Sequence, residues 1–266
     1  MKLFASGVFY HLEIHQNRKG IPYLFLMHGF MGSGSVFSEL IDNIRDFCNP
    51  VTIDLLGHGD TEGSDKPGRY SHNQQVSDLS SILDRLAFDD LYIYAYSMGG
   101  RLALHLVMKY QKLCKGLILE STGCGIEDNA SRNERKGVDE KRAIEIKKDF
   151  DSFVQKWNRN SLFQSSSAKN SDNYLKHLGK QVPEYMAASL KGFGSGVMPP
   201  VCNMLEKIHT PCLLLAGSED QKYRLQMSQM KKIMPEAELI VIEEAGHRAH
   251  FDQPKKIAKI IQSFLS

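Results

Sequence analysis

The stretch Tyr92-Ile93-Tyr94-Ala95-Tyr96-Ser97-Met98-Gly99-Gly100-Arg101-Leu102-Ala103-Leu104 decides the fold of this chain. Residues 91–94 are mostly β-branched or aromatic and predict a strand. Beyond the glycines, apolar residues return at helical spacing and predict a helix. Between them lies Ala95-x-Ser97-x-Gly99, whose small residues allow a strand to turn sharply into a helix. Such a turn lifts Ser97 above the strand ends and points the first helical N–H groups at an approaching ligand.

A plainer interpretation of Ser97 is a helix N-cap, because serine is a favoured residue at that position. The usual pattern of the strained turn also has glycine where this chain has Ala95. Alanine is small enough to fit. The choice between a strained turn and a helix N-cap for Ser97 therefore depends on which residues follow the other predicted strands.

Apolar runs that predict strands alternate with stretches that predict amphipathic helices. The predicted strands are 8–15 (an edge strand), 23–27, 51–55, 91–94, 115–120, 211–216 and 239–242, and the predicted helices include 36–47, 73–86, 224–234 and 254–265. This alternation is typical of a mostly parallel, twisted α/β sheet with helices on both faces. Strand-like runs disappear between 124 and 203, where charged, helix-prone sequence follows. We therefore predict a core of residues 1–123 and 204–266 and a helical cap of residues 124–203.

The composition excludes several classes of protein. A formal net charge of +2 gives no argument for nucleic-acid binding. We find no apolar run long enough for a membrane span, and Met1–Phe9 is too short and mixed for a signal peptide. The five cysteines are scattered and lack metal-ligand spacing, so we expect reduced, mostly buried thiols in a cytoplasmic protein. They are Cys48, Cys114, Cys124, Cys202 and Cys212.

Three polar residues follow three predicted strands: Ser97, Asp220 and His247. The carboxyl ends of parallel strands share one edge of a sheet, where ligands bind. An imidazole can take the proton of a serine hydroxyl, and a carboxylate fixes the tautomer of that imidazole. The sequence thus predicts a catalytic triad. Glu120 could supply the acid instead, and His250 could replace the histidine; we favour Asp220 and His247.

Two backbone N–H groups are candidate oxyanion donors. The loop His28-Gly29-Phe30-Met31-Gly32-Ser33 follows the strand 23–27, and its glycines allow the Phe30 N–H to turn inward. The Met98 N–H, at the start of the helix after Ser97, is the second candidate. The alternative is a plain glycine turn. His58, in a glycine-flanked loop, is interpreted as structural.

These motifs together resemble the α/β-hydrolase superfamily, over nearly the whole chain, and so imply its fold. Within that superfamily the chain is similar to the 2-succinyl-6-hydroxy-2,4-cyclohexadiene-1-carboxylate synthases (MenH) of menaquinone biosynthesis. The similar stretches are 96–104, 118–121, 162–165, 194–199 and Gly246-His247-x-x-His250. The resemblance implies an enzyme that eliminates pyruvate from a substrate bearing several carboxylates. In that reaction Ser97, activated by His247, abstracts a proton without forming an acyl-enzyme.

Such a substrate demands cationic partners. Arg101 lies one turn into the helix after Ser97, with a surface arginine as the alternative interpretation. The resemblance also assigns substrate binding to Tyr96, Arg135 and Trp157. Arg132 fits nearly as well as Arg135, and Trp157 could be a core anchor.

The chain departs from the family at two places. Thr122-Gly123-Cys124-Gly125 stands where the family shows a small-Pro-Gly stretch. A cap arginine is absent near 177–180, where Lys176, His177 or Lys180 could substitute without offering its bidentate contact.

The alternatives to the synthase are a carboxylic-ester or C–C-bond hydrolase with the same triad, and a non-catalytic binding module. Intact Ser97, Asp220 and His247 argue against the binding module. We expect a small carboxylate-bearing substrate as the partner. No metal ion or organic cofactor is implied, because neither zinc-ligand spacing nor a phosphate-binding glycine loop is present.

Overall fold

Residues 1–163, 174–175 and 181–266 are described by a computed structural model, and within them the predicted α/β sheet is confirmed. Eight strands form one sheet in the order β1-β2-β4-β3-β5-β6-β7-β8. They are β1 (Lys2–Ala5), β2 (Val8–Ile14), β3 (Tyr23–Met27), β4 (Asn49–Ile53), β5 (Leu91–Tyr96), β6 (Gly116–Glu120), β7 (Cys212–Gly217) and β8 (Ala237–Ile242). Strands β3 to β8 run parallel, whereas β1 and β2 pair antiparallel with their neighbours.

The sequence predicts an edge strand at 8–15, and this is wrong for β2, which corresponds to it. β1 pairs along β2 from Lys2↔His11 to Ala5↔Val8 and forms the edge itself. A strand of four residues is too short for an alternating pattern to be visible in the sequence.

The α-helices in the described residues are α1 (Ser38–Ile44), α2 (His72–Leu86), α3 (Met98–Lys109), α4 (Asn129–Lys148), α5 (Phe150–Asn158), α7 (Pro183–Phe193), α8 (Gln221–Ile233), α9 (Ala249–Asp252) and α10 (Pro254–Leu265). Short 3₁₀ segments are η1 (Gly34–Phe37), η2 (Pro67–Tyr70), η3 (Ser161–Phe163) and η4 (Cys202–Lys207). Two predicted helices differ at their ends. The helix expected at 36–47 divides into η1 and α1, and α8 begins three residues earlier than expected because Asp220 caps it by accepting from the Tyr223 N–H.

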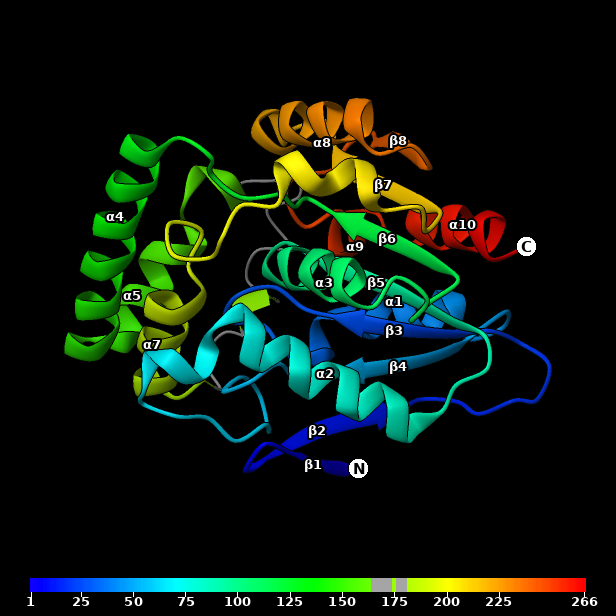
Figure 1. Ribbon diagram of the computed structural model, residues 1–266, viewed down its shortest axis with the longest axis horizontal. Helices are drawn as coiled ribbons and strands as arrows, with labels where there is room; N and C mark the ends of the chain where they lie inside the picture. Colours follow the sequence, from blue (N-terminus) through cyan, green and yellow to red (C-terminus); the bar gives the residue numbers. More distant parts are fainter. Residues whose placement is uncertain (164–173, 176–180) are drawn as a thin grey trace.

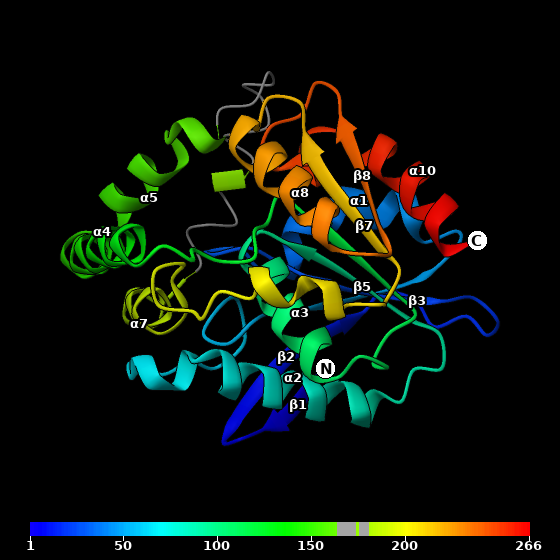
Figure 2. The ribbon, with the colours of Figure 1, turned by 45° about the horizontal axis from the view of Figure 1, so that its top comes forward.

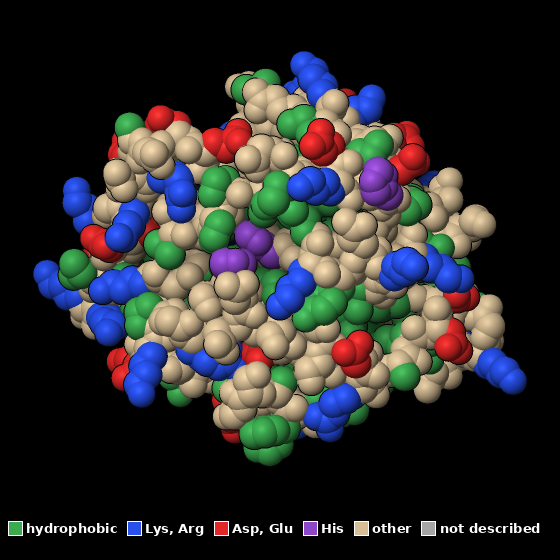
Figure 3. Space-filling view, in the orientation of Figure 1, with side chains coloured by type: hydrophobic (Ala, Val, Ile, Leu, Met, Phe, Trp, Pro, Cys, Tyr) green, Lys and Arg blue, Asp and Glu red, His purple; other side chains and the backbone are tan. Residues whose placement is uncertain are grey.

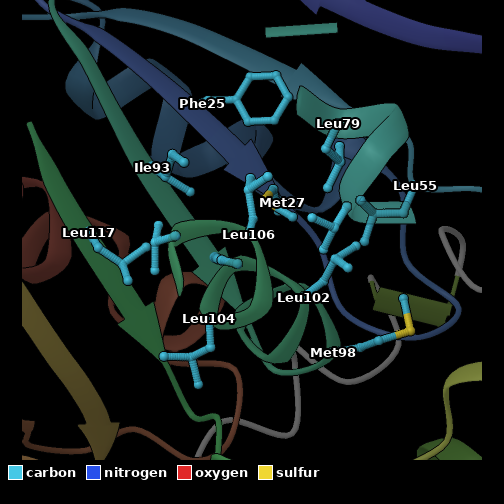
Figure 4. Packing of buried hydrophobic residues seen from close by; sticks show 14 of the residues in the cluster. Phe25, Met27, Leu55, Leu79, Ile93, Met98, Leu102, Leu104, Leu106 and Leu117 are labelled. Carbon is cyan, nitrogen blue, oxygen red and sulfur yellow. The ribbon is translucent and has the colours of Figure 1, made fainter. Parts of the chain in front are cut away.

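The sheet separates two hydrophobic clusters because neighbouring strand residues point to opposite faces. In β3, Phe25 and Met27 pack on the side of α2, α3 and α8, whereas Leu24 and Leu26 pack on the side of α1 and α10. Figure 4 shows part of the first cluster, where Leu102 and Leu106 of α3 lie over β3. This packing fixes α3, and with it the residue at its N-terminus, against the centre of the sheet.

Helices α4, α5 and α7 lie outside these layers. The arrowheads of β3, β4 and β6 point toward them, so they stand beyond the carboxyl ends of the parallel strands (Figure 1). The turned view agrees, with the three helices gathered on one side of the sheet (Figure 2). The boundaries of a cap at 124 and 203 stay a prediction.

The expectation that all five cysteines are reduced is wrong for two of them. Cys124, just after β6, forms a disulfide with Cys202 at the start of η4. The pairing joins the segment that leaves the sheet to the segment that returns to it, 78 residues later. The other three cysteines are free, and burial raises the pKa of the Cys48 and Cys114 thiols to about 12. Those two thiols are therefore protonated at neutral pH.

Replacing Cys202 with serine is expected to lower the free energy of unfolding by about 2–4 kcal/mol, because an open chain gains the conformational freedom that the bridge removes. Urea unfolding followed by circular dichroism measures the change. Treating the unaltered protein with a reducing agent should cause a similar loss and should leave the variant unaffected. Equal stability of the oxidised and reduced forms would contradict this expectation.

Within the described residues, no helix is both long and apolar enough to cross a membrane. Basic and acidic side chains are interspersed over the face drawn in Figure 3, as a net charge of +2 leads one to expect.

Candidate active site

Ser97 lies at the sharp turn between β5 and α3. Its backbone has φ 52° and ψ −107°, a conformation that non-glycine residues rarely adopt. The Ser97 N–H donates to the Glu120 carbonyl oxygen at 2.9 Å, and its own carbonyl oxygen accepts from the Thr122 hydroxyl at 2.8 Å. The Ser97 side chain makes no capping hydrogen bond to α3. The N-cap interpretation therefore does not explain this residue.

Close backbone contact explains the small residues around the turn. A Cβ atom built on Gly99 would lie 2.6 Å from the carbonyl oxygens of both Met27 and His28. A Cβ atom built on Gly29 would lie 2.7 Å from Tyr96 Cε1 and 3.4 Å from Ser97 Cβ. The loop after β3 thus packs directly against the turn that holds Ser97.

The three predicted triad residues meet at one point. His247 Nε2 lies 3.1 Å from Ser97 Oγ, and His247 Nδ1 lies 2.7 Å from Asp220 Oδ2. Because Nδ1 faces a carboxylate, we assign its proton there, which leaves Nε2 to accept the serine proton. His247 and Asp220 are almost fully buried. The other Asp220 oxygen accepts from the Tyr223 N–H at the start of α8, so the carboxylate is held on both sides.

The two competing residues pair with each other. His250 Nδ1 lies 2.8 Å from Glu120 Oε2, and the His250 N–H donates to Glu120 Oε1 at 3.0 Å. The Tyr94 hydroxyl donates to the same carboxylate, and all three side chains are fully buried beneath the turn. Burial and the Glu120 charge raise the pKa of Tyr94 well above its usual value. Glu120 and His250 are therefore committed to a separate internal pair.

The two candidate oxyanion donors belong to segments that adjoin Ser97. Phe30 belongs to the loop packed on the turn, and Met98 is the first residue of α3. Within the described residues neither N–H donates to a protein acceptor. His28 holds the loop that contains Phe30 in place. Its Nε2 accepts from the Leu55 N–H at 2.9 Å, and its Nδ1 faces the Gly29 carbonyl oxygen at 2.7 Å.

His58, interpreted from the sequence as a structural residue, makes its contacts with loop residues. Its Nδ1 faces the Leu56 carbonyl oxygen at 2.9 Å, and its ring packs 5.2 Å from that of His28. Burial, with His28 adding to it, lowers the pKa of His58 to about 3. In the unfolded chain the same ring titrates near 6.5.

We therefore expect acid to destabilise the fold through His58. The folded state keeps this ring neutral, whereas the unfolded chain binds a proton on it below pH 6.5. The free energy of unfolding is therefore unaffected by His58 above pH 6.5 and decreases as the pH falls from 6.5 toward 3. The loss amounts to about 1.4 kcal/mol per pH unit. Urea unfolding at several pH values, compared with His58→Asn, measures the slope. Identical slopes in the two proteins would show that His58 is not the titrating group.

A cavity of about 450 Å³ opens onto the triad and brings the predicted substrate-binding residues together. Arg101, Tyr96, Arg135 and Trp157 all line it. Arg132 does not; its guanidinium approaches the Val197 and Met198 carbonyl oxygens at 3.5 Å, on a separate surface hollow. The suggested substitutes Lys176, His177 and Lys180 lie outside the described residues.

Arg101 has no carboxylate partner within the described residues. Its Nη1 donates to the Phe193 carbonyl oxygen at 3.2 Å, and its guanidinium lies 5.3 Å from the Phe193 ring centre. Burial lowers the pKa of Arg101 to about 10, which leaves it charged at neutral pH. A partly buried, charged guanidinium that no described carboxylate pairs with has the chemistry to bind an anion.

The remaining cationic lining was not predicted. Arg142, Lys222 and Arg248 also face the cavity. Arg142 follows Arg135 by seven residues on α4, and both guanidinium groups bond the buried Asp139 carboxylate. This spacing of two helical turns was a usable signal in the sequence, because it puts both arginines on one face. Among the described residues that line it, the cavity thus has five basic side chains against two acidic ones, Glu219 and Asp220.

One further cluster of titratable residues is close enough together to hold a metal ion. His11, Asp54 and Asp60 bring ligand atoms within 4.8 Å of one another on the β2–β4 side of the sheet. Both Asp54 oxygens already accept backbone N–H groups, from Gly34 at 2.6 Å and from Asp60 at 2.9 Å. These hydrogen bonds explain the cluster without a metal ion, because through them Asp54 holds two loops in place.

Comparison with known proteins agrees with this geometry. The model of the alpha/beta hydrolase family matches residues 24–260. A Bacillus subtilis protein, named as a candidate 2-succinyl-6-hydroxy-2,4-cyclohexadiene-1-carboxylate synthase, is 35% identical over 90% of this chain and 89% of its own length. The solved structure of MenH from S. aureus superposes with a TM-score of 0.90 at 30% identity, over 96% of this chain and 97% of that one. A thermophilic esterase from Thermogutta terrifontis superposes with a TM-score of 0.85 at 22% identity, over 100% and 97%. That last likeness concerns the fold alone.

Proposed function

Because this chain belongs to the alpha/beta hydrolase family, we propose that it works as a 2-succinyl-6-hydroxy-2,4-cyclohexadiene-1-carboxylate synthase, eliminating pyruvate from a polycarboxylate cyclohexene substrate. The observation that carries the proposal is the hydrogen-bonded chain Ser97–His247–Asp220 at the wall of an arginine-lined cavity. Likeness to synthases over nearly the whole chain supports it.

Proton abstraction is the first step that this geometry supports. His247 Nε2, 3.1 Å from Ser97 Oγ, takes the hydroxyl proton as the oxygen removes a proton from substrate carbon. The C–H electron pair then forms the new double bond of the ring while the C–O bond to the pyruvyl group breaks. The proton held on His247 can return to the departing enol, so Ser97 and the imidazole end unchanged. Asp220, 2.7 Å from Nδ1, stabilises the transient imidazolium.

Negative charge develops on the substrate before the leaving group departs. The Phe30 and Met98 N–H groups, free of protein acceptors within the described chain, are the proposed donors to that charge. Arg101 is the proposed partner of a substrate carboxylate. Tyr96 and Trp157 would flank the ring, and Arg135 shares Asp139 with Arg142, which leaves one net positive charge for the ligand.

The competing function is a carboxylic-ester or C–C-bond hydrolase. It would use the same triad, with Ser97 attacking a carbonyl carbon and the two N–H groups binding the oxyanion. The cationic cavity favours the synthase. Four arginines line it, and a simple ester carries no negative charge that could pair with them.

The deciding experiment compares two substrates with the purified protein. The succinyl-enolpyruvyl cyclohexene substrate should release pyruvate rapidly, followed by coupling to lactate dehydrogenase, while a nitrophenyl ester should turn over poorly. Fast ester hydrolysis without pyruvate release would establish the hydrolase instead. We further propose that residues 124–203 act as a cap over this cavity, and that the protein works in the cytoplasm.

A further inference from the structure

Arg248 follows His247 directly and lines the same cavity. Only 5% of its surface is exposed. No carboxylate lies within ion-pair distance of it in the described parts of the chain, although the half-buried Arg69 and the cap residues Arg135 and Arg142 all have one. Among the described residues, Arg248 thus differs from those three arginines in having no carboxylate partner.

The side chain is held in a defined position. Its guanidinium carbon lies 3.6 Å from the centre of the Tyr174 ring and 4.2 Å from that of the Phe163 ring. Its Nη1 donates to Asn158 Oδ1 at 3.1 Å. Its Nε is fully buried and has no acceptor. Two aromatic faces and one neutral amide therefore orient the group and leave at least one of its N–H donors unused.

This environment is incomplete without an anion. Arginine keeps its charge in proteins, and burying a charge without a counter-ion is costly. Contact with aromatic faces offsets part of that cost and an amide oxygen adds a neutral hydrogen bond. Neither supplies negative charge, whereas a planar guanidinium matches a carboxylate in shape and donor spacing.

We propose that Arg248 binds a second carboxylate of the substrate and so makes the cavity selective for dicarboxylates over monocarboxylates. Arg101 binds the other carboxylate from a different wall, because it projects from α3 against α7 while Arg248 projects from the start of α9 against α5. This inference rests on the proposed function for the identity of the substrate, and on the cavity alone for the class of ligand.

A purely structural role is the competing explanation. Arg248 would then only tie Asn158 of α5 to the loop that carries His247. Both explanations predict loss of activity when Arg248 is removed, so activity cannot separate them. Ligand charge can, because a brace has no preference between a dicarboxylate and its neutral diamide.

The test measures the binding of succinate, acetate and the neutral succinamide by isothermal titration calorimetry. The proteins are the unaltered chain, Arg248→Met, Arg248→Lys and, as a matched control, Arg159→Met at the exposed end of α5. We expect the unaltered protein to prefer succinate, and Arg248→Met to bind it about 10- to 100-fold more weakly. Arg248→Lys should recover part of the affinity, and Arg159→Met should behave as the unaltered chain.

Near-UV circular dichroism reports whether each variant is folded. If Arg248→Met does not fold, Arg248→Lys decides, since it keeps the charge but loses the bidentate contact and should bind succinate several-fold more weakly. Unaltered succinate affinity in a folded variant overturns the proposal, as does failure of the unaltered protein to bind succinate at millimolar concentration. Charge-dependent succinate binding in a protein that releases no pyruvate would instead reject the synthase and keep the role of Arg248.

Discussion

Replacing Ser97 with alanine is expected to lower the rate constant for pyruvate release at least about 10³-fold and to leave the fold intact. The hydroxyl is the group that meets the substrate proton, and His247 reaches it at 3.1 Å. Alanine also removes nothing that α3 needs, because the Ser97 side chain makes no capping bond. Stopped-flow or coupled measurement of pyruvate gives the rate, and urea unfolding gives the stability.

The control for this change is Ser81→Ala, at an exposed position of α2, which should alter neither quantity. Asp220→Asn should also slow the reaction, because the amide no longer favours the Nε2 acceptor tautomer of His247. Since the three residues act as one unit, adding Asp220→Asn to Ser97→Ala should cost little more than Ser97→Ala alone. Activity of the alanine variant within tenfold of the unaltered chain would remove Ser97 from the mechanism.

The core of the fold could be predicted because its signals are local. Strand β3 is a continuous apolar run that the glycine loop ends abruptly, and helix α10 has one apolar face; both match their predicted ranges. The approach of His247 to Ser97, 150 residues apart, was predictable for a different reason. Parallel strands put their carboxyl ends at one edge of the sheet, so residues that directly follow such strands can be predicted to lie close together.

Other features depend on contacts that no local pattern reports. The Cys124–Cys202 bridge requires two positions 78 residues apart to lie side by side, and the spacing of the cysteines in the sequence does not indicate this. Nothing in the local sequence distinguishes Arg248 from a surface arginine. Its contacts with Tyr174 and Phe163, from a distant part of the chain, appear only in the structure. Glu120 and His250 compete with the triad on sequence grounds alone. Only their pairing with each other, 130 residues apart, removes them.

Replacing Gly99 with alanine is expected to disable the enzyme and to lower the free energy of unfolding by about 3 kcal/mol or more. The new Cβ atom would lie 2.6 Å from the carbonyl oxygens of Met27 and His28, which belong to the backbone of the central strand and the loop after it. A backbone atom cannot swing aside as a long side chain can. The first turn of α3 must therefore lift away from β3, and Ser97 and the Met98 N–H must move with it.

The matched control is Gly137→Ala, the same substitution inside helix α4. Nothing lies within 4 Å of a Cβ atom built there, so alanine should stabilise the protein by about 0.5–1 kcal/mol through its better helix propensity. Urea unfolding and the pyruvate assay on both variants give the comparison. If Gly99→Ala kept normal stability and activity, the tight contact between β3 and α3 could not be what sets the position of Ser97. Opposite signs for the two glycines would show that contact at position 99, rather than the loss of glycine itself, holds the site together.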